Sequence, residues 1–276
     1  MKPPIPEIPA PVWRSFKDLQ EWEELHQTRP KGDKRLSVRQ LGESGNTQTF
    51  RCPYHSWLYD LDGSLIDAYN MDDDFDMAEN GLVPCHMRVE EGHIFVNFSQ
   101  AAEPPPFGRL SAGGEYFEFA EKYGIADLKI AARQSYPILG NWKLAIENFL
   151  ECYHCPVAHR DFCTLVDMDT YEVTTHGIWS SHMAEAGRSS NTAYSVEGAT
   201  VTDHAVWWLW PNTCLMRYPG RSNFIVMHVI PEGPGRTRET YDFFFETAEV
   251  TEAEVEAIAY VDNVLQAEDI ALVESV

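Results

Sequence analysis

Three side chains near the middle of the sequence have the types and the spacing of a metal site. Glu151 and His154 are three residues apart, and His159 follows five residues after His154. Two imidazoles and a neighbouring carboxylate suit a divalent first-row metal, and one further carboxylate would complete an open-sided iron site. A second interpretation stays open, in which Lys143, Glu147 and Glu151 form a surface ladder of ion pairs and His154 interacts with the helix end.

The element that must position these residues is a helix, which we predict over residues 141–154. Residues three apart on a helix lie on neighbouring points of its surface, so Glu151 can reach His154. On an unbroken helix the His159 ring would point about 140° away from that of His154. Pro156 must end or bend the helix just before it, and this break can turn His159 back toward His154.

A further carboxylate is expected from the last helix, which we predict from the capping box Thr251–Glu254 to the last residue. The apolar stripe of this helix contains Val255, Ile258, Leu265, Leu272 and Val276. Asp269 falls in the middle of that stripe, where a carboxylate needs a cation or hydrogen-bond donors. Asp262 shares the stripe and is the competing candidate. A buried Asp that is satisfied by an ordinary Tyr, Trp or backbone donor is the structural alternative.

Composition restricts the partners and the compartment. The 276 residues include 43 acidic and 21 basic side chains, for a net charge of −22, and 44% of them are hydrophobic. Such an acidic surface repels phosphate backbones and anionic lipids, so we expect neither nucleic-acid nor membrane binding. No apolar run is long enough to span a membrane, and no signal peptide is evident. We therefore expect the six cysteines to be cytoplasmic thiols or metal ligands rather than parts of a disulfide framework.

The pattern along the chain predicts an α+β fold. Strand-like alternation fills residues 47–98, with a hairpin turn at Asp62-Gly63. An antiparallel meander over residues 204–246 is followed by the last helix, an order typical of a sheet with a helix packed on it. We predict four segments: an extended arm, a short helix over 15–27 and an irregular stretch within 1–44; a β domain over 45–100; a Pro/Gly linker over 101–114; and an α+β domain over 115–276.

Three segments resemble one protein family. NWKLAIENFLECYHCPVAHRDF is similar to the mononuclear-iron motif of the α subunits of Rieske non-haem iron oxygenases, and QAEDIALVESV resembles their C-terminal ligand helix. RCPYHSWLYDLDGSL resembles the second half of their Rieske cluster motif. The resemblance extends from about Gly45 to the C-terminus. It implies a partial all-β Rieske-like domain followed by a helix-grip catalytic domain.

The resemblance also implies roles for individual residues. His154, His159 and Asp269 would form the 2-His-1-carboxylate triad that holds Fe(II) and leaves positions for O2 and water. Glu151 would conduct electrons from the Rieske centre of a neighbouring subunit, where most family members have Asp. Asn148 would lie beside this path as a hydrogen-bond donor.

The Rieske motif itself is incomplete. Cys52 and His55 would be two of the four ligands of a [2Fe–2S] cluster, but the family needs a C-x-H pair roughly 15 to 20 residues earlier. That region reads PKGDKRLSVRQ, and only His26 lies upstream. We therefore predict a degenerate, deleted or misread segment and a truncated ligand helix. Replacement ligands at Cys85 and His86 are disfavoured because both lie in a strand-edge context.

The implied function is an oxygenase component that uses Fe(II) and O2 to hydroxylate or N-demethylate a small molecule. Electrons would come from a flavin reductase or ferredoxin and ultimately from NAD(P)H, and the assembly would be a homotrimer. The segment ECYHCPVAH, with Glu rather than Asp at position 151, resembles the corresponding segment of the oxygenases that act on quaternary ammonium compounds such as betaines, choline and carnitine. Four aromatic residues could face such a cation or could simply be sheet core: Trp207, Trp208, Trp210 and Tyr218.

Three other functions compete with this one. Aromatic-ring dihydroxylation would need the same iron site. A ferritin-like di-iron protein would use Glu151-x-x-His154 and Glu23-x-x-His26. A non-catalytic helix-grip module would bind a small apolar ligand around a relic metal site. The remaining residues of interest are expected to be structural or solvated histidines and buried thiols: His93, His176, His182, His204, His228, Cys163 and Cys214.

Overall fold

The computed structural model describes residues 14–16, 47–90, 93–98, 123–177 and 179–276, and the chain divides into two compact units, Met1–Pro104 and Pro105–Val276. The predicted arm, the irregular stretch and the linker lie outside the described residues, as does most of the predicted helix over 15–27. That helix prediction is wrong at its start. Strand β1 (Arg14–Phe16) pairs there with β6 (His93–Asn97), so sheet pairing overrides the helical spacing.

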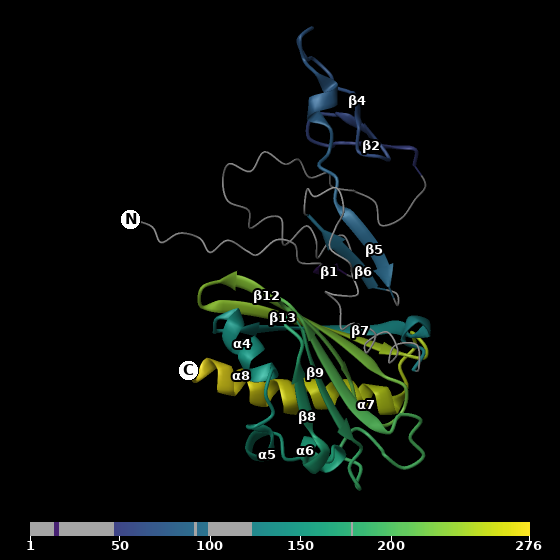
Figure 1. The fold of residues 1–276 in the computed structure, drawn as a ribbon. Helices are drawn as coiled ribbons and strands as arrows, with labels where there is room; N and C mark the ends of the chain where they lie inside the picture. The colour runs from purple at the N-terminus through teal and green to yellow at the C-terminus, as the bar shows by residue number, and fades with distance from the viewer. Residues whose placement is uncertain (1–13, 17–46, 91–92, 99–122, 178) are drawn as a thin grey trace. The chain divides into compact units, whose positions relative to one another are not determined.

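The first unit contains two three-stranded antiparallel sheets (Figure 1). One has the order β1-β6-β5 and the other the order β2-β3-β4. Their further elements are β2 (Thr49–Arg51), β3 (Leu58–Asp60), β4 (Leu65–Asp67), β5 (His86–Glu90) and the 3-10 helix η1 (Met77–Asn80). The predicted turn at Asp62-Gly63 is confirmed, because Gly63 has a φ of 87° between β3 and β4.

The second unit is built on a seven-stranded antiparallel sheet of order β7-β13-β12-β11-β10-β9-β8. The predicted meander over 204–246 is confirmed as the four strands β10 to β13. Strands β7, β8 and β9 extend the sheet beyond that prediction. The bounds are β7 (Lys129–Ile138), β8 (Glu172–Thr175), β9 (Trp179–Glu185), β10 (Asp203–Leu209), β11 (Thr213–Arg217), β12 (Phe224–Gly233) and β13 (Arg236–Phe245).

The C-terminal helix lies across this sheet (Figure 1). It consists of α7 (Glu252–Tyr260), a π-helical turn η4 (Val261–Leu265) and α8 (Gln266–Glu274). The predicted capping box is confirmed, since the Thr251 side chain accepts from the Glu254 N–H and the Glu254 carboxylate accepts from the Thr251 N–H.

The π-helical turn changes which residues of this helix are buried. Ile258 and Leu265 are buried as predicted, but Leu272 and Val276 are exposed. A π turn holds an extra residue, so the rotation expected from a regular α-helix no longer applies beyond it. Past the turn, the buried positions are Gln266 and Val273. Val255, in the first turn of α7, is also exposed although the stripe predicted it buried.

The helix predicted over 141–154 ends earlier than expected. Helix α4 (Trp142–Phe149) is capped by Asn141, whose side chain accepts from the Lys143 N–H at 3.0 Å. Pro156 does not terminate this helix. It lies in the first turn of a second helix, α5 (Cys155–Ala158), where its missing N–H is not needed. The other short helices in the described ranges are η2 (Ile125–Asp127), α6 (Phe162–Leu165) and η3 (Met168–Thr170).

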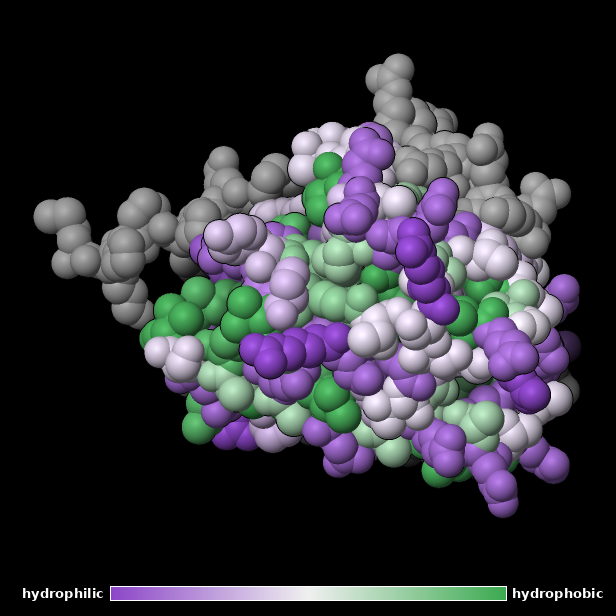
Figure 2. Space-filling model, turned by 90° about the horizontal axis from the view of Figure 1, so that it is seen from below, coloured by the Kyte–Doolittle hydropathy of each residue, from purple (hydrophilic) through white to green (hydrophobic). Residues whose placement is uncertain are grey.

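The core of the second unit consists of residues from the sheet together with residues from α4 and the C-terminal helix, including the fully buried Val229 and Phe243. On the face shown in Figure 2, hydrophilic residues interrupt the hydrophobic ones. Within the described ranges, no helix combines the length and hydropathy needed to cross a membrane. The protein is therefore α+β as predicted, and the seven-stranded sheet is incompatible with a ferritin-like four-helix bundle.

Candidate metal centre

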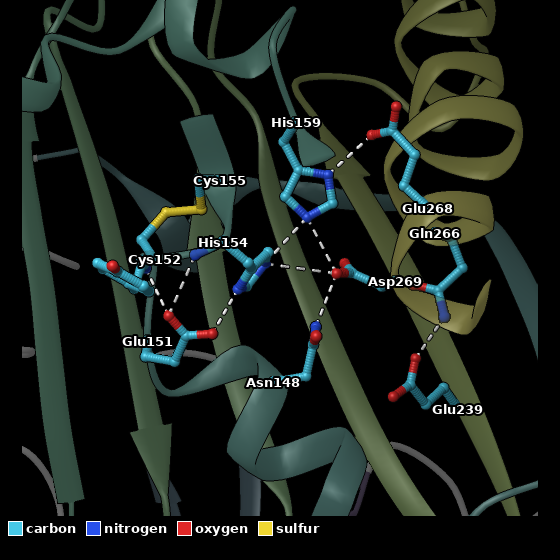
Figure 3. Close-up of polar contacts among 11 residues, drawn as sticks. Asn148, Glu151, Cys152, His154, Cys155, His159, Glu239, Gln266, Glu268 and Asp269 are labelled. Carbon is cyan, nitrogen blue, oxygen red and sulfur yellow. Dashed lines mark hydrogen bonds and ion pairs between the residues drawn. A yellow bond between two sulfur atoms is a disulfide. The ribbon is translucent and has the colours of Figure 1, made fainter. Parts of the chain in front are cut away.

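Three possible ligand atoms converge where α5 meets α8. Nε2 of His154, Nε2 of His159 and Oδ1 of Asp269 all lie within 4.8 Å of one another (Figure 3). The two Nε2 atoms are 3.1 Å apart, and Asp269 Oδ1 lies 2.9 Å from His159 Nε2 and 3.7 Å from His154 Nε2. Neighbouring ligands of one octahedral ion at about 2.1 Å would lie about 3 Å apart. The donor set and its spacing therefore fit a divalent first-row metal bound on one face.

Short helix α5 brings the two histidines together. His154 lies at its N-cap and His159 at its C-cap, where the His159 N–H donates to the Cys155 carbonyl at 2.8 Å. The predicted return of His159 toward His154 therefore occurs, although one short helix rather than a proline-broken long helix produces it. Asp269 comes from the first turn of α8. The competing candidate Asp262 is instead hydrogen-bonded by the Tyr136 hydroxyl and lies outside the cluster.

Each histidine has its other ring nitrogen held by a glutamate. His154 Nδ1 lies 2.5 Å from Glu151 Oε1, and His159 Nδ1 lies 2.8 Å from Glu268 Oε2. An ionised carboxylate can only accept, so in both rings the proton belongs on Nδ1 and the lone pair on Nε2. This is the tautomer that a metal requires, and carboxylate–histidine pairs of this kind orient metal-binding imidazoles.

The same carboxylates shift the proton affinities of the site. Burial alone would lower the pKa of His159, but hydrogen bonds and charge interactions with Asp269 and Glu268 raise it overall. Burial would raise the pKa of Glu151, but His154 and the backbone N–H of Tyr153 lower it overall. Protons therefore compete with a metal at His159, whereas Glu151 stays ionised.

Asn148 holds the third candidate ligand, Asp269. From the end of α4 its Nδ2 donates to Asp269 Oδ1 at 2.6 Å. On the other side, the buried Gln266 donates from Nε2 to Glu239 Oε2 at 2.5 Å. Burial, together with the nearby charge of Asp269, raises the pKa of Glu239 to about 7 despite the hydrogen bond from Gln266.

Sequence reasoning missed three of these supporting residues: Glu239, Gln266 and Glu268. The sequence could have indicated two of them by their proximity to Asp269. Glu268 directly precedes Asp269, and Gln266 lies one turn before it. Nothing in the sequence indicates Glu239, because only the packing of β13 against the C-terminal helix brings it close.

A disulfide joins Cys152 and Cys155 in the turn that carries Glu151 and His154 (Figure 3). The expectation that all cysteines are thiols or ligands is wrong for this pair, because the short turn after α4 brings their Cα atoms within 5.0 Å. Cys214 is a buried thiol as predicted, and Cys163 is a half-buried one.

A cavity of about 90 Å³ adjoins the cluster, and His154, His159 and Asp269 are among the residues that line it. Of the four aromatic residues that could either face a cation or form sheet core, only Tyr218 lines the cavity. Trp207 is fully buried on the opposite face of β10, and Trp208 packs against the core. Trp210 contacts the ring of Trp208 and does not line the cavity.

The histidines outside the cluster have different surroundings. His182 and His204 line the cavity, although sequence reasoning treated both as structural or solvated. The alternation of side chains along a strand could have indicated this for His204, because it places His204 on the same face of the sheet as Val206. His176 is exposed and His228 is buried away from the cavity.

Cys52 and His55 lie in the turn between β2 and β3. The Cys52 N–H donates to the Trp57 carbonyl at 2.7 Å, Cys52 is half-buried and His55 is exposed. The structure therefore brings this predicted pair onto one turn. In the described part of the chain, the only group of three or more metal-binding side chains is that of His154, His159 and Asp269.

Comparison with known proteins agrees with these features. Residues 125–276 match the family model of the ring-hydroxylating α subunit, catalytic domain. The carnitine monooxygenase oxygenase subunit of Acinetobacter pittii is 35% identical over 244 residues, which cover 85% of this chain and 63% of that protein. Choline monooxygenase of Atriplex hortensis is 29% identical over 249 residues, which cover 88% and 55%.

A solved quaternary ammonium Rieske monooxygenase superposes with a TM-score of 0.71 at 32% identity, covering 86% of this chain and 64% of that one. The chain thus spans less than two thirds of the length of these relatives. The matched region contains both histidines and Asp269. The chain belongs to the ring-hydroxylating α subunits of the Rieske oxygenases.

Proposed function

We propose that this chain forms the iron-binding catalytic part of an oxygenase that hydroxylates or N-demethylates a small quaternary ammonium compound with O2. The observation that carries this proposal is the arrangement of three side chains. The imidazoles of His154 and His159 each have Nδ1 held by a glutamate, and their Nε2 atoms lie next to the carboxylate of Asp269. A 2-His-1-carboxylate set with open positions is the ligand arrangement of non-haem Fe(II) oxygenases. When bound, Fe(II) supplies the activation of O2.

The residues of this chain orient the three candidate metal ligands and surround the site. Glu151 and Glu268 keep the Nδ1 protons of the two histidines, so that both Nε2 lone pairs stay available. Asn148 fixes the carboxylate of Asp269 through its amide. Phe149, Phe162 and Leu265 give the cavity wall apolar surface next to these groups, and electrostatic interactions are stronger beside apolar surface than in bulk water.

The charge and shape of the cavity support a cationic substrate. Its walls include the aromatic rings of Tyr171, Tyr218 and Tyr241 and the carboxylates of Glu151 and Asp269. Among the described residues that line it, none is Lys or Arg. Aromatic faces beside negative charge attract a quaternary ammonium group. The named substrates of the relatives, carnitine and choline, belong to this class.

Electron supply and assembly follow from the same family. The Glu151 side chain is 47% exposed while it contacts His154, which suits a path from the Rieske centre of a neighbouring subunit in a homotrimer. A flavin reductase or ferredoxin would be the external donor. We propose that residues 45–100 are a partial Rieske domain, joined through the linker 101–114 to the catalytic domain 115–276. Cys52 and His55 alone cannot complete a [2Fe–2S] cluster, so turnover by this chain should be low.

The test is anaerobic reconstitution with Fe(II), followed by measurement of iron, acid-labile sulfide and oxygen consumption. We expect about one iron per chain, little sulfide and slow turnover with reductase and NAD(P)H. His159→Ala should lose the iron, and His176→Ala, at an exposed position, should retain it. Failure of the unmodified protein to bind Fe(II) would refute the iron site. Fast turnover with a reductase alone would refute the incomplete cluster.

A further inference from the structure

The sheet wall of the cavity contains two buried histidines that the iron site does not use. His182 on β9 is 1% exposed and His204 on β10 is 2% exposed. In the pairing of these strands His182 faces Val206 and His204 faces Ala184, so both rings lie on one face of the sheet. That face lines the cavity together with Tyr218.

Each of these rings has one nitrogen without a hydrogen-bond partner. His182 Nδ1 lies 3.0 Å from the Tyr171 hydroxyl, while its Nε2 has no partner. The His204 ring is hydrogen-bonded to the backbone of Arg217, while its Nδ1 has no partner. Buried polar atoms are nearly always satisfied, because an unpaired one costs about 1–3 kcal/mol. Both residues line the same cavity, so a ligand group bound there could supply the missing partners of these two atoms.

The protonation of His204 identifies what that group must be. The interaction with the Arg217 backbone raises the pKa of His204, so the ring donates to a carbonyl there and its proton is on Nε2. Burial nevertheless lowers the pKa of His204 to about 3 and that of His182 to about 4, so both rings are neutral at pH 7. Nδ1 of His204 is therefore a buried acceptor. It attracts an O–H donor and repels a carboxylate.

The surroundings of His204 suit an ammonium group next to that donor. The Tyr171 ring stacks on the His204 ring at 6.1 Å, and the Tyr218 ring lies 5.3 Å from it. Both tyrosines line the cavity, and burial raises the pKa of both well above the ordinary value, so they stay neutral. The aromatic faces and the acceptor are thus within the span of one small molecule.

We propose that His204 is a specificity-determining residue that accepts a hydrogen bond from a substrate hydroxyl, so that the cavity prefers a quaternary ammonium alcohol. The preference is over two competitors, an alkylammonium without a hydroxyl and a zwitterion in which a carboxylate replaces it. This inference rests on the proposed function and narrows its substrate class. It assigns His182 the complementary contact on the same hydroxyl oxygen.

The experiment is isothermal titration of the Fe(II)-reconstituted chain under argon with three probes. Choline carries the hydroxyl, ethyltrimethylammonium lacks it, and glycine betaine carries a carboxylate in its place. We expect choline to bind about tenfold more tightly than ethyltrimethylammonium, the ratio that one neutral hydrogen bond supplies, and betaine to bind more weakly than choline.

Three variants connect that preference to His204. His204→Phe keeps an aromatic ring without an acceptor and should abolish the preference. His204→Asn places an amide oxygen near the position of Nδ1 and should restore much of it. His176→Phe, at an exposed position, is the matched control and should leave all three affinities unchanged.

The outcomes separate this inference from the proposed function. Equal affinity for choline and ethyltrimethylammonium, tighter binding of betaine than of choline, or a preference that survives His204→Phe would each overturn the role of His204. The comparison of probes on the unmodified protein decides the matter even if a variant does not fold. Failure to bind any trimethylammonium probe, by contrast, would overturn the quaternary ammonium proposal.

Discussion

The two units of this chain each carry a cofactor motif, but the motifs differ in what holds their side chains. In the C-terminal unit every candidate ligand has a side-chain partner: Glu151 on His154, Glu268 on His159 and Asn148 on Asp269. In the N-terminal unit, Cys52 and His55 are placed by the backbone of a tight turn, and His55 is exposed. The two candidate ligands of the N-terminal unit are thus placed by backbone alone, whereas each of the three candidate ligands of the C-terminal unit is also oriented by a partner side chain.

The largest effect should come from removing a ligand of the C-terminal site. His159→Ala or Asp269→Ala should reduce Fe(II) affinity by more than the roughly 10- to 100-fold that loss of an outer partner causes. The reason is that two remaining donors cannot enclose one face of the ion. Equilibrium dialysis under argon measures the affinity.

The N-terminal motif supplies the matched comparison. Cys52→Ser and His55→Ala should leave Fe(II) affinity of the reconstituted chain unchanged, because neither residue belongs to the cluster of three. A loss of affinity in either variant as large as that in His159→Ala would break the distinction between the two motifs.

The next effect concerns pH and the buried Glu239, which is hydrogen-bonded to Gln266 of the C-terminal helix. Its folded-state pKa of about 7 lies above the ordinary value of 4.5, so the fold favours the neutral carboxyl. This contribution to stability is complete below the unfolded-state pKa and is lost as pH rises through 7. Glu239→Gln, which stays neutral, should be more stable than the unmodified chain by up to about 3 kcal/mol at pH 8.5 and similar to it at pH 5.

Urea unfolding of the metal-free chain at the two pH values measures this difference. Glu249→Gln, at an exposed position, is the control and should change stability little at either pH. Equal stabilities of Glu239→Gln and the unmodified chain at pH 8.5 would mean that the carboxyl of Glu239 ionises without penalty.

Much of the candidate site could be predicted because its ligands lie in short, patterned segments. The spacing of His154 and His159 identified both, and the placement of Asp269 in an apolar stripe favoured it. The stripe was nevertheless calculated for a regular helix. The π-helical turn Val261–Leu265 changes the phase beyond it, which is why Leu272 is exposed. Asp269 thus lies beside the two histidines, as expected, although the burial predicted for the rest of that helix face was only partly right.

The remaining features depend on contacts between distant segments. Glu239 and Gln266 are 27 residues apart and meet only when the helix packs on the sheet. His182 and His204 have no metal-ligand spacing in the sequence, and only the register of β9 and β10 puts both in one cavity wall. Periodicity predicts which face of an element is buried, but it does not predict what that face meets.

A smaller effect should follow from removing one oriented partner. Glu268→Gln keeps the shape of the side chain but removes the charge that holds the His159 Nδ1 proton, and it should weaken Fe(II) binding roughly 10- to 100-fold. Glu147→Gln, on the exposed side of α4, is the matched control. If both variants bind Fe(II) as the unmodified chain does, the side-chain partners do not distinguish the C-terminal site from the N-terminal turn.

The smallest effect should come from the disulfide between Cys152 and Cys155. The bond closes a loop with a sequence separation of only three residues, so it restricts the unfolded chain little and should contribute about 2 kcal/mol to stability. The loop carries Glu151 and His154, however, so reduction also frees the turn that holds one ligand and its partner. The double variant Cys152→Ser, Cys155→Ser should therefore lower the urea midpoint modestly and weaken Fe(II) binding less than Glu268→Gln does.

Cys163→Ser, at a half-buried free thiol, is the control for loss of a sulfur atom. If the double variant binds Fe(II) as weakly as His159→Ala, the disulfide rather than the glutamates would be the main support of His154.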